Sequence, residues 1–180
     1  MKTEQEACQK LKNGGVIVHA TEAVFGLAAI AYDRQSFERI SYLKDRPIDK
    51  KFIVLFADLN SVSEVVELDV ALKKEILAGW PGPNTWVLPA RGNVPFWIKD
   101  SDGCVAVRVT AHCQCREIIG NAGPVLSTSA NRAGQNAPKT LLDAKMNFGN
   151  EVDFYLPGDL GGMETVTTIR NGLTGETIRK

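Results

Sequence analysis

The chain has 180 residues, with 21 basic and 21 acidic side chains and a hydrophobic content of 44% that suffices for a packed core. Zero net charge argues against a protein that coats nucleic acid indiscriminately, although it leaves room for a local basic patch. Residues 1–13 lack the apolar core of a signal peptide, and no apolar run reaches the roughly 18 residues of a membrane span, so we expect a cytoplasmic protein without membrane contact.

Strands and helices are expected to interleave along the whole chain. Apolar or alternating runs predict strands at residues 16–18, 27–31, 52–56, 86–89, 104–109, 124–127, 152–156, 166–170 and 176–179. Helical periodicity predicts helices at residues 3–13, 34–44, 58–66, 69–77, 112–120 and 141–148. This order of elements is typical of an α/β protein with a mixed sheet.

Local signals predict several element boundaries. Gly14-Gly15 would end the first helix with a left-handed cap. Asp58 or Asn60 could cap the third helix, and Asp69 the fourth. The run at 52–56 is apolar throughout, as in a strand that is covered on both faces.

Familiar catalytic and metal-binding motifs are absent. The sequence has no P-loop, no G-x-G-x-x-G after a strand, no H-E-x-x-H and no G-x-S-x-G. His112-Cys113-Gln114-Cys115 lacks a second ligand pair at zinc spacing, and a helix would turn its two thiols to different faces. We expect structural or surface roles for these residues, a structural role for His19, and no disulfides in a chain of this size.

Two polar segments could belong either to turns or to a ligand site. Ser127-Thr128-Ser129-Ala130-Asn131 follows a short apolar strand, and such a run is typical of a turn or helix cap. Strand ends in α/β proteins also open onto ligand crevices, where hydroxyls and an amide can donate to phosphate or carboxylate oxygens. Likewise, the rigid loop at 80–84 is either a packed corner or a ligand loop that presents the hydroxyl of Thr85.

Cations at two places suggest an anion site. Lys44 and Arg46 flank Asp45 at a predicted helix end, where they either complement the helix dipole or bind phosphate. Arg108 lies inside an apolar strand, and arginine is rarely buried without a partner. It therefore either pairs with a carboxylate such as Glu22 or faces a cavity and awaits an anion.

Together these segments resemble the YrdC (TsaC) family of threonylcarbamoyl-AMP synthases. The matching segments fall in the family's order over about residues 14–180, and they are Thr21–Leu27, Lys44–Pro47, Trp80–Thr85, Val105–Val109, Ser127–Asn131, Thr167–Arg170 and Leu173–Glu176 with Arg179. The resemblance implies one YrdC-like domain over residues 1–180, of the short bacterial type. It implies a twisted mixed sheet flanked by helices, with a large concave ligand cavity.

The reaction implied by the resemblance is a nucleotidyl transfer. L-Threonine and bicarbonate or CO₂ would give N-carboxythreonine, whose new carboxylate attacks the α-phosphorus of ATP to give L-threonylcarbamoyladenylate and pyrophosphate. Partner proteins would use the adenylate to modify position 37 of tRNAs that read ANN codons. Mg²⁺ would come with ATP and be held by phosphate oxygens and water, with no tightly bound cofactor and no protein metal site.

By resemblance, four residues would be catalytic. Lys44 and Arg46 would hold the triphosphate, and Ser129 and Asn131 would face them across the cavity. Alanine at either cation is expected to abolish activity and leave the fold intact. Further contacts to the nucleotide would come from Thr85, Ser127, Thr167 and Arg179.

Threonine would be bound by Thr21 and Arg108, with Arg108 as the counter-charge of the carboxylate. Glu22 is a candidate for the base that deprotonates the amine, although pairing with Arg108 or a surface lysine is the favoured role. The family usually has proline before the Thr-Glu pair, and Ala20 at this position makes the loop less rigid.

Two other functions fit parts of the sequence. A module that binds double-stranded RNA or tRNA, for example in ribosome maturation, could use a basic surface formed by Lys44, Arg46, Lys50, Lys51, Arg91, Lys99, Arg108, Arg132 and Lys139. A carbamoyl transferase is a third alternative, because a related domain occurs in hydrogenase maturation proteins. The zinc fingers and acylphosphatase-like part that accompany that domain are absent from this sequence.

Overall fold

The computed structural model describes residues 2–45 and 52–179, and within these ranges nine strands form one mixed sheet. Their order across the sheet is β7-β1-β2-β6-β3-β5-β4-β8-β9. Adjacent strands pair in parallel at β1–β7, β3–β5 and β4–β8, and the other neighbouring pairs are antiparallel. The strands span Ile17–Ala20 (β1), Phe25–Ile30 (β2), Ile53–Phe56 (β3), Asn84–Pro89 (β4), Cys104–Val109 (β5), Val125–Ser129 (β6), Phe154–Tyr155 (β7), Thr168–Asn171 (β8) and Thr177–Arg179 (β9).

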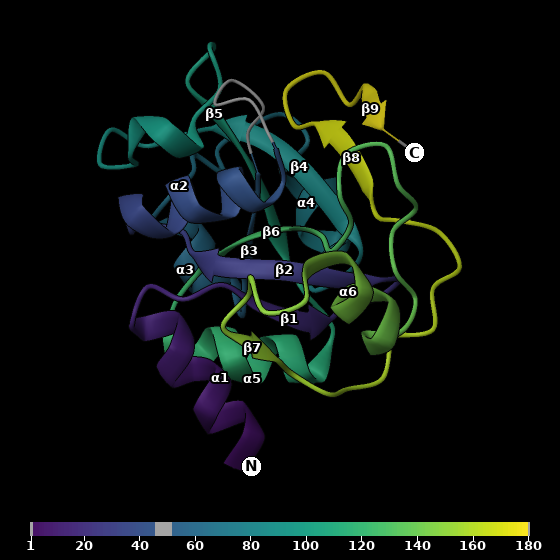
Figure 1. Cartoon of the computed structure of the whole chain (residues 1–180). Coiled ribbons are helices and arrows are strands. Elements are labelled where there is room, and N and C mark those ends of the chain that lie inside the picture. The colour runs from purple at the N-terminus through teal and green to yellow at the C-terminus, as the bar shows by residue number, and fades with distance from the viewer. Residues whose placement is uncertain (1, 46–51, 180) are drawn as a thin grey trace.

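Helices cover both faces of the sheet, so the α/β class with a mixed sheet is confirmed (Figure 1). On one face α1 and α5 lie together, and on the other α2 contributes to a larger apolar core. None of the described helices has the length and apolar character needed to cross a membrane. The helices span Lys2–Lys12 (α1), Arg34–Leu43 (α2), Leu59–Ser63 (α3), Lys73–Ala78 (α4), Cys113–Ala122 (α5) and Leu141–Phe148 (α6), with a 3₁₀ turn at Phe96–Ile98.

The register of the strands determines which side chains share a face. Paired residues on neighbouring strands point to the same side, and Ser127 pairs with both Ala28 and Ile53, while Leu55 pairs with Arg108. Ala28 and Leu55 belong to the core beneath α1 and α5. Ser127, Ile53 and Arg108 therefore lie on the face of α1 and α5.

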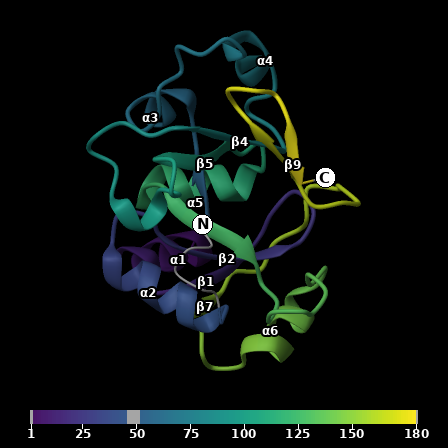
Figure 2. The same ribbon diagram turned by 90° about the horizontal axis from the view of Figure 1, so that it is seen from above.

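The C-terminal hairpin β8–β9 lies at one edge of the sheet, far from α6 (Figure 2). Because β8 pairs in parallel with β4, the hairpin adds Ile169 to the same sheet beside Thr85. Arg170 of β8 attaches the hairpin to β4 and α4. The Arg170 guanidinium lies over the ring of Trp86 and forms an ion pair with Glu75 of α4. Residues near the C-terminus can thus contribute to a site on the sheet.

Several predicted local signals agree with the structure, although many element ends differ by one to three residues. Gly14 has a φ of 79° and its N–H donates to the main-chain oxygen of Leu11, so the left-handed cap after α1 is confirmed. Asp58 caps α3 by accepting a hydrogen bond of 2.9 Å from the N–H of Ser61. The central residues of β3 are buried, as predicted for a strand covered on both faces.

The predicted cap at Asp69 is wrong. A turn in which the N–H of Lys73 donates to the main-chain oxygen of Val70 precedes the helix, so α4 begins one turn later than expected. Its N-cap is Leu72, which has no side-chain hydrogen bond. The helix is consequently shorter than the pattern of apolar residues predicted.

Candidate functional site

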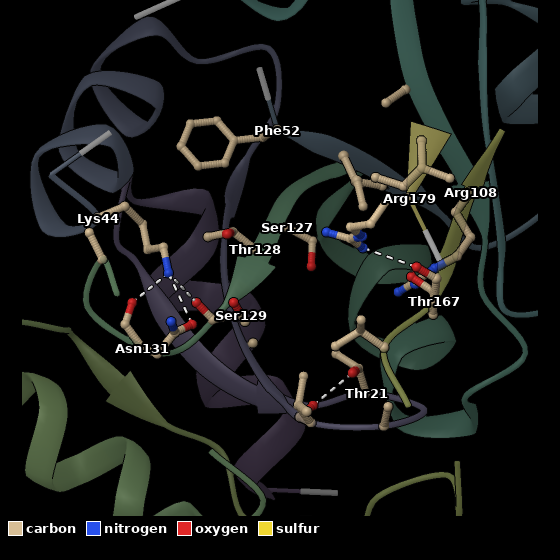
Figure 3. A pocket seen from close by; sticks show the side chains of 18 of the residues that line it. Thr21, Lys44, Phe52, Arg108, Ser127, Thr128, Ser129, Asn131, Thr167 and Arg179 are labelled. Carbon is tan, nitrogen blue, oxygen red and sulfur yellow. Dashed lines mark hydrogen bonds between the residues drawn. The ribbon is translucent and has the colours of Figure 1, made fainter. Parts of the chain in front are cut away.

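A cavity of about 400 Å³ opens on the part of the sheet face that α1 and α5 leave uncovered. This volume falls in the usual range of small-molecule sites. Its walls come from segments far apart in the sequence, and they include Thr21, Gly26, Lys44, Phe52, Ala106, Arg108, Ser127, Thr128, Ser129, Asn131, Val166, Thr167, Ile169 and Arg179. The expected ligand cavity is therefore present, and polar side chains gather on two opposite walls (Figure 3).

On one wall, the ammonium of Lys44 lies against the end of β6. Lys44 follows α2 directly, and 7% of its surface is exposed to solvent. Its Nζ donates to the main-chain oxygens of Ser129, at 2.8 Å, and Asn131, and lies 3.2 Å from Asn131 Oδ1. Asn131 Nδ2 in turn donates to Gln135 O at 2.7 Å, which turns Oδ1 toward the lysine.

This arrangement differs from the expected one, in which Ser129 and Asn131 face Lys44 across the cavity. The reason is that β6 continues through Ser129, which pairs with Gly26 of β2. The longer strand brings Ser129 and Asn131 to the end of α2. Lys44, Ser129 and Asn131 therefore form one cluster, visible on one side of the pocket in Figure 3.

On the opposite wall, Arg108 is held between two partners. Its Nη1 donates to Thr167 Oγ1 at 2.7 Å, and its Nη2 lies 3.3 Å from Glu22 Oε2. Arg179, from the C-terminal strand, donates to the main-chain oxygen of Thr167 at 3.0 Å. Both alternatives for Arg108 thus hold at once, because it pairs with Glu22 and also lines the cavity.

The charges on this wall influence one another. Burial raises the pKa of Glu22, but the charge of Arg108 and the hydrogen bond from Thr110 more than offset burial and leave the pKa below its usual value. Burial and the nearby charge of Arg108 lower the pKa of Arg179. Two guanidinium groups thus share one wall, where Glu22 pairs with Arg108, and an entering anion would relieve their mutual repulsion.

The Thr21 loop forms the third side of the cavity. Thr21 Oγ1 donates to the main-chain oxygen of Val24 at 2.7 Å, which leaves its lone pairs to accept from a substrate amine. Residues 157–163, here called the strap, cross this loop, and the N–H groups of Gly161 and Met163 donate to the main-chain oxygens of Thr21 and Glu22 at 3.0 Å each. These bonds hold the Thr21 loop, which follows Ala20, against the strap.

Comparisons with known proteins identify the family of the chain. The family model Sua5_yciO_yrdC, described as "Telomere recombination", matches residues 9–180. The chain is 42% identical to the threonylcarbamoyl-AMP synthase of Nitrosococcus oceani over 178 residues, which cover 96% of this chain and 95% of that protein. It is 40% identical to the enzyme of the same name from Pseudomonas paraeruginosa, with 97% and 95% covered. The chain belongs to the Sua5/YciO/YrdC family.

A solved member of this family is similar in structure as well. P. abyssi Sua5, determined in complex with L-threonine, is 28% identical and has a TM-score of 0.86. The match covers 93% of this chain and 50% of that one, so the chain spans about half the length of this solved relative. The resemblance to the YrdC family in the sequence is confirmed.

Eight of the ten residues expected from the family resemblance line the cavity: Thr21, Lys44, Arg108, Ser127, Ser129, Asn131, Thr167 and Arg179. Arg46 lies outside the described residues, as do Lys50 and Lys51. Sequence reasoning missed Ala106, Ile169 and Phe52 among the lining residues. Ala106 could have been found, because it stands two residues before Arg108 on the same face of a strand.

The tenth residue, Thr85, does not line the cavity. It is fully buried in β4 and pairs with Ile169, whose side chain does line the cavity. The loop before it is a packed corner, in which Trp80 is 5% exposed and its Nε1 donates to the main-chain oxygen of Asn84. β4 begins at Asn84, two residues earlier than predicted, so Thr85 lies inside the strand and its hydroxyl has no hydrogen-bond partner there.

Of the residues proposed for an RNA-binding surface, Arg91 and Lys139 are exposed, whereas Lys44 and Arg108 are buried. Arg108 is 4% and Lys44 is 7% exposed, and both point into the cavity. Arg132 is half-buried, with Nη1 donating to Leu43 O at 3.0 Å and its guanidinium 4.7 Å from the Phe148 ring. Lys44, Arg108 and Arg132 thus donate hydrogen bonds to groups within the protein.

The histidine and cysteine residues lie either in structural positions or at the surface, as expected. His112 caps α5 by accepting from the N–H of Cys115, while Cys113 is exposed. His19 is fully buried, with Nδ1 3.2 Å from Cys115 Sγ. All four cysteines are free.

Proposed function

We propose that this chain is a threonylcarbamoyl-AMP synthase that makes L-threonylcarbamoyladenylate and pyrophosphate from L-threonine, bicarbonate or CO₂, and ATP. The observation that carries the proposal is one cavity with cationic groups on two opposite walls and the hydroxyl of Ser127 between them. Such a cavity can hold two anionic groups at once, a carboxylate on one side and phosphates on the other. Curated relatives at 40% identity or more carry this name over nearly their full lengths.

Threonine would lie on the Arg108 wall. The guanidinium matches a carboxylate in shape and charge, and Thr21 Oγ1 offers acceptor lone pairs to the amine. The P. abyssi relative was solved with L-threonine, which supports an amino-acid site in this fold. Neither Thr21 nor Arg108 would need to move far, because both are fixed by hydrogen bonds.

ATP would extend from this wall toward Lys44. The ammonium would exchange part of its contact with the oxygens of Ser129 and Asn131 for phosphate oxygens, and Arg46 would add a second cation. These four residues would form the catalytic group, which acts by positioning and by stabilising charge in the transition state. Ser127, Thr167 and Arg179 would contact the rest of the nucleotide.

The two steps of the proposed reaction need only the three substrates and no resident cofactor. The neutral amine of threonine forms a bond to the carbon of CO₂ and releases a proton. With bicarbonate, the same bond forms as a C–O bond breaks, and the amine proton leaves with the hydroxide as water. An oxygen of the new carboxylate then attacks the α-phosphorus, and pyrophosphate leaves with the electron pair of the broken P–O bond. The cations of the cavity stabilise the negative charge that develops on phosphate oxygens.

Mg²⁺ would enter with ATP. Among the described residues no group of three or more His, Cys, Asp or Glu side chains could hold a metal ion, so phosphate oxygens and water would supply its ligands. We further propose a cytoplasmic location, with partner proteins that transfer the threonylcarbamoyl group to position 37 of tRNAs that read ANN codons. Direct contact of tRNA with this chain is a separate prediction that a filter-binding titration would test.

Pyrophosphate release tests the proposal. The protein is incubated with ATP, Mg²⁺ and bicarbonate, with and without L-threonine, and serine serves as a control amino acid. Release that depends on threonine supports the synthase reaction. A folded protein that releases no pyrophosphate and binds RNA with a steep salt dependence would instead be the RNA-binding module.

A further inference from the structure

The carboxylate of Glu22 lies behind the wall of the cavity. Thr21 and Ala23 line the cavity on either side of it in the sequence, whereas Glu22 is not among the lining residues and is 5% exposed. It therefore sits one layer away from any bound ligand. A group in this place can act on substrate only through a residue in the wall.

Both oxygens of Glu22 face buried partners. Oε1 accepts a hydrogen bond of 2.6 Å from Thr110 Oγ1, and Oε2 lies 3.3 Å from Nη2 of Arg108. Thr110 is fully buried, and its hydroxyl oxygen also accepts from the N–H of His112 at 3.1 Å. The carboxylate is therefore held by the segment that begins α5 while it contacts the guanidinium.

The guanidinium is thereby fixed from two sides. Thr167 Oγ1 accepts from Nη1 at 2.7 Å, and Glu22 lies against Nη2. Nε is buried without a hydrogen-bond partner, so it is turned away from the open cavity. A guanidinium carries five N–H groups, so these two partners leave donors for the oxygens of a substrate carboxylate.

We propose that Glu22 is a positioning residue that sets the orientation of Arg108 for the substrate carboxylate, and that it is not the base that deprotonates the amine. The inference rests on the proposed function, since it concerns the threonine site of the synthase. Glu22 also balances part of the charge of Arg108 before substrate enters. A base, in contrast, would need an oxygen exposed to the amine, and Glu22 offers none to the cavity.

The test is Glu22→Gln, which keeps the shape of the side chain and removes its charge. We expect the Kd of L-threonine, measured by calorimetry, and its KM to rise about 10- to 100-fold, because an interaction with a charged group is lost. The KM of ATP and the acid limb of the pH profile of kcat should stay as in wild type, and kcat should fall less than about threefold. A loss of kcat of more than about 100-fold with unchanged threonine affinity, together with a changed acid limb, would identify a base and overturn the proposal. Unchanged threonine affinity and kcat would overturn it as well.

A second pair of variants keeps the test decisive if Glu22→Gln does not fold. Thr110→Val leaves the charge of Glu22 and removes its hydrogen bond, and we expect threonine affinity to fall about 3- to 10-fold. Thr110→Ser should restore it. Equal threonine affinities of Thr110→Val and wild type would overturn the proposal.

The matched control is Glu75→Gln. Glu75 also pairs with an arginine, Arg170, but this pair lies on the surface and outside the cavity. Threonine affinity should be unchanged in this variant, and a comparable loss would show that the Glu22 effect is not specific. If the wild type neither binds threonine nor releases pyrophosphate, the proposed function itself is overturned. If the wild type is active and binds threonine with the same affinity as Glu22→Gln, only the proposed role of Glu22 is overturned.

Discussion

The ammonium of Lys44 lies 2.8 Å from the main-chain oxygen of Ser129, so the end of α2 is hydrogen-bonded to the end of β6. The same cation is proposed to hold phosphate in the reaction. A buried lysine that donates to main-chain oxygens contributes to folding as well as to catalysis. Removal of the Lys44 side chain is therefore expected to affect stability as well as activity.

Lys44→Ala should abolish threonine-dependent pyrophosphate release and also destabilise the protein. The lost hydrogen bonds involve a charged donor, each worth about 1.5–3 kcal/mol, and two main-chain oxygens would be left without this donor. Urea unfolding monitored by circular dichroism gives the change in free energy. Lys139→Ala, at an exposed position, is the control and should leave stability and activity within error. If Lys44→Ala were as stable as the wild type, Lys44 would serve activity alone, as expected from the sequence.

Ser127 and Thr85 should differ in their effect on ATP. Ser127 lines the cavity, so Ser127→Ala should raise the KM of ATP about 2- to 10-fold through the loss of one neutral hydrogen bond. Thr85→Val should leave this KM unchanged, because the Thr85 hydroxyl is buried in β4 without a partner. It should also keep or slightly raise the melting temperature, since a buried hydroxyl that makes no hydrogen bond is removed. A higher KM of ATP in Thr85→Val would mean that Thr85 contacts the nucleotide after all.

Gly161 should be required for the shape of the threonine site. A Cβ at this position would lie 2.9 Å from the Cα of Glu22, and main chain cannot yield as a flexible side chain does. Gly161→Ala should therefore push the strap off the Thr21 loop, with a loss of about 1–3 kcal/mol in stability and weaker threonine binding. Calorimetry with L-threonine measures the second effect.

Gly162 provides the matched control for this prediction. It has a φ of 80°, and a Cβ there would meet nothing within 4 Å. Gly162→Ala should lose about 1 kcal/mol through backbone strain alone and keep its affinity for threonine. Equal threonine binding in both alanine variants would show that the close approach of Gly161 to Glu22 has no functional consequence.

Local signals in the sequence were sufficient for most elements, because they act within a few residues. Gly14 ends α1 and Asp58 begins α3 through contacts to their immediate neighbours. Asp69 shows the limit of this reasoning, since a suitable side chain does not cap a helix when a turn comes first. Whether Thr85 precedes or enters a strand depends on its pairing with Ile169, which is distant in the sequence.

Eight residues that line the cavity could be predicted from the family resemblance, but their contacts with one another could not. The sequence left open whether Arg108 pairs with Glu22 or faces a cavity, and the structure contains both features. Likewise, nothing near Lys44 in the sequence indicates that Ser129 would be its neighbour. Such contacts depend on how strands pair across the sheet, which a single sequence does not specify.

The pH dependence of stability should reveal His19. Burial is the largest cause that lowers its pKa from 6.5 to about 4, because the charged ring would be taken out of water. Between these two values the unfolded chain binds a proton that the folded chain does not bind. The contribution of the neutral His19 ring to the free energy of unfolding is therefore present above about pH 6.5, and it is lost as the pH drops toward 4.

From pH 7 to pH 5 the expected loss is about 2 kcal/mol, by linkage of the folded and unfolded pKa values of His19. Urea unfolding at these two pH values measures it in the wild type and in His19→Gln, which cannot titrate there. The variant should be less stable at pH 7 and lose much less between pH 7 and pH 5. The carboxylates of Glu22, Asp33 and Asp58 do not compete in this window, because their lowered pKa values confine their effect to lower pH. An equal loss in wild type and variant would mean that His19 is protonated in the folded protein, which its full burial beside Cys115 argues against.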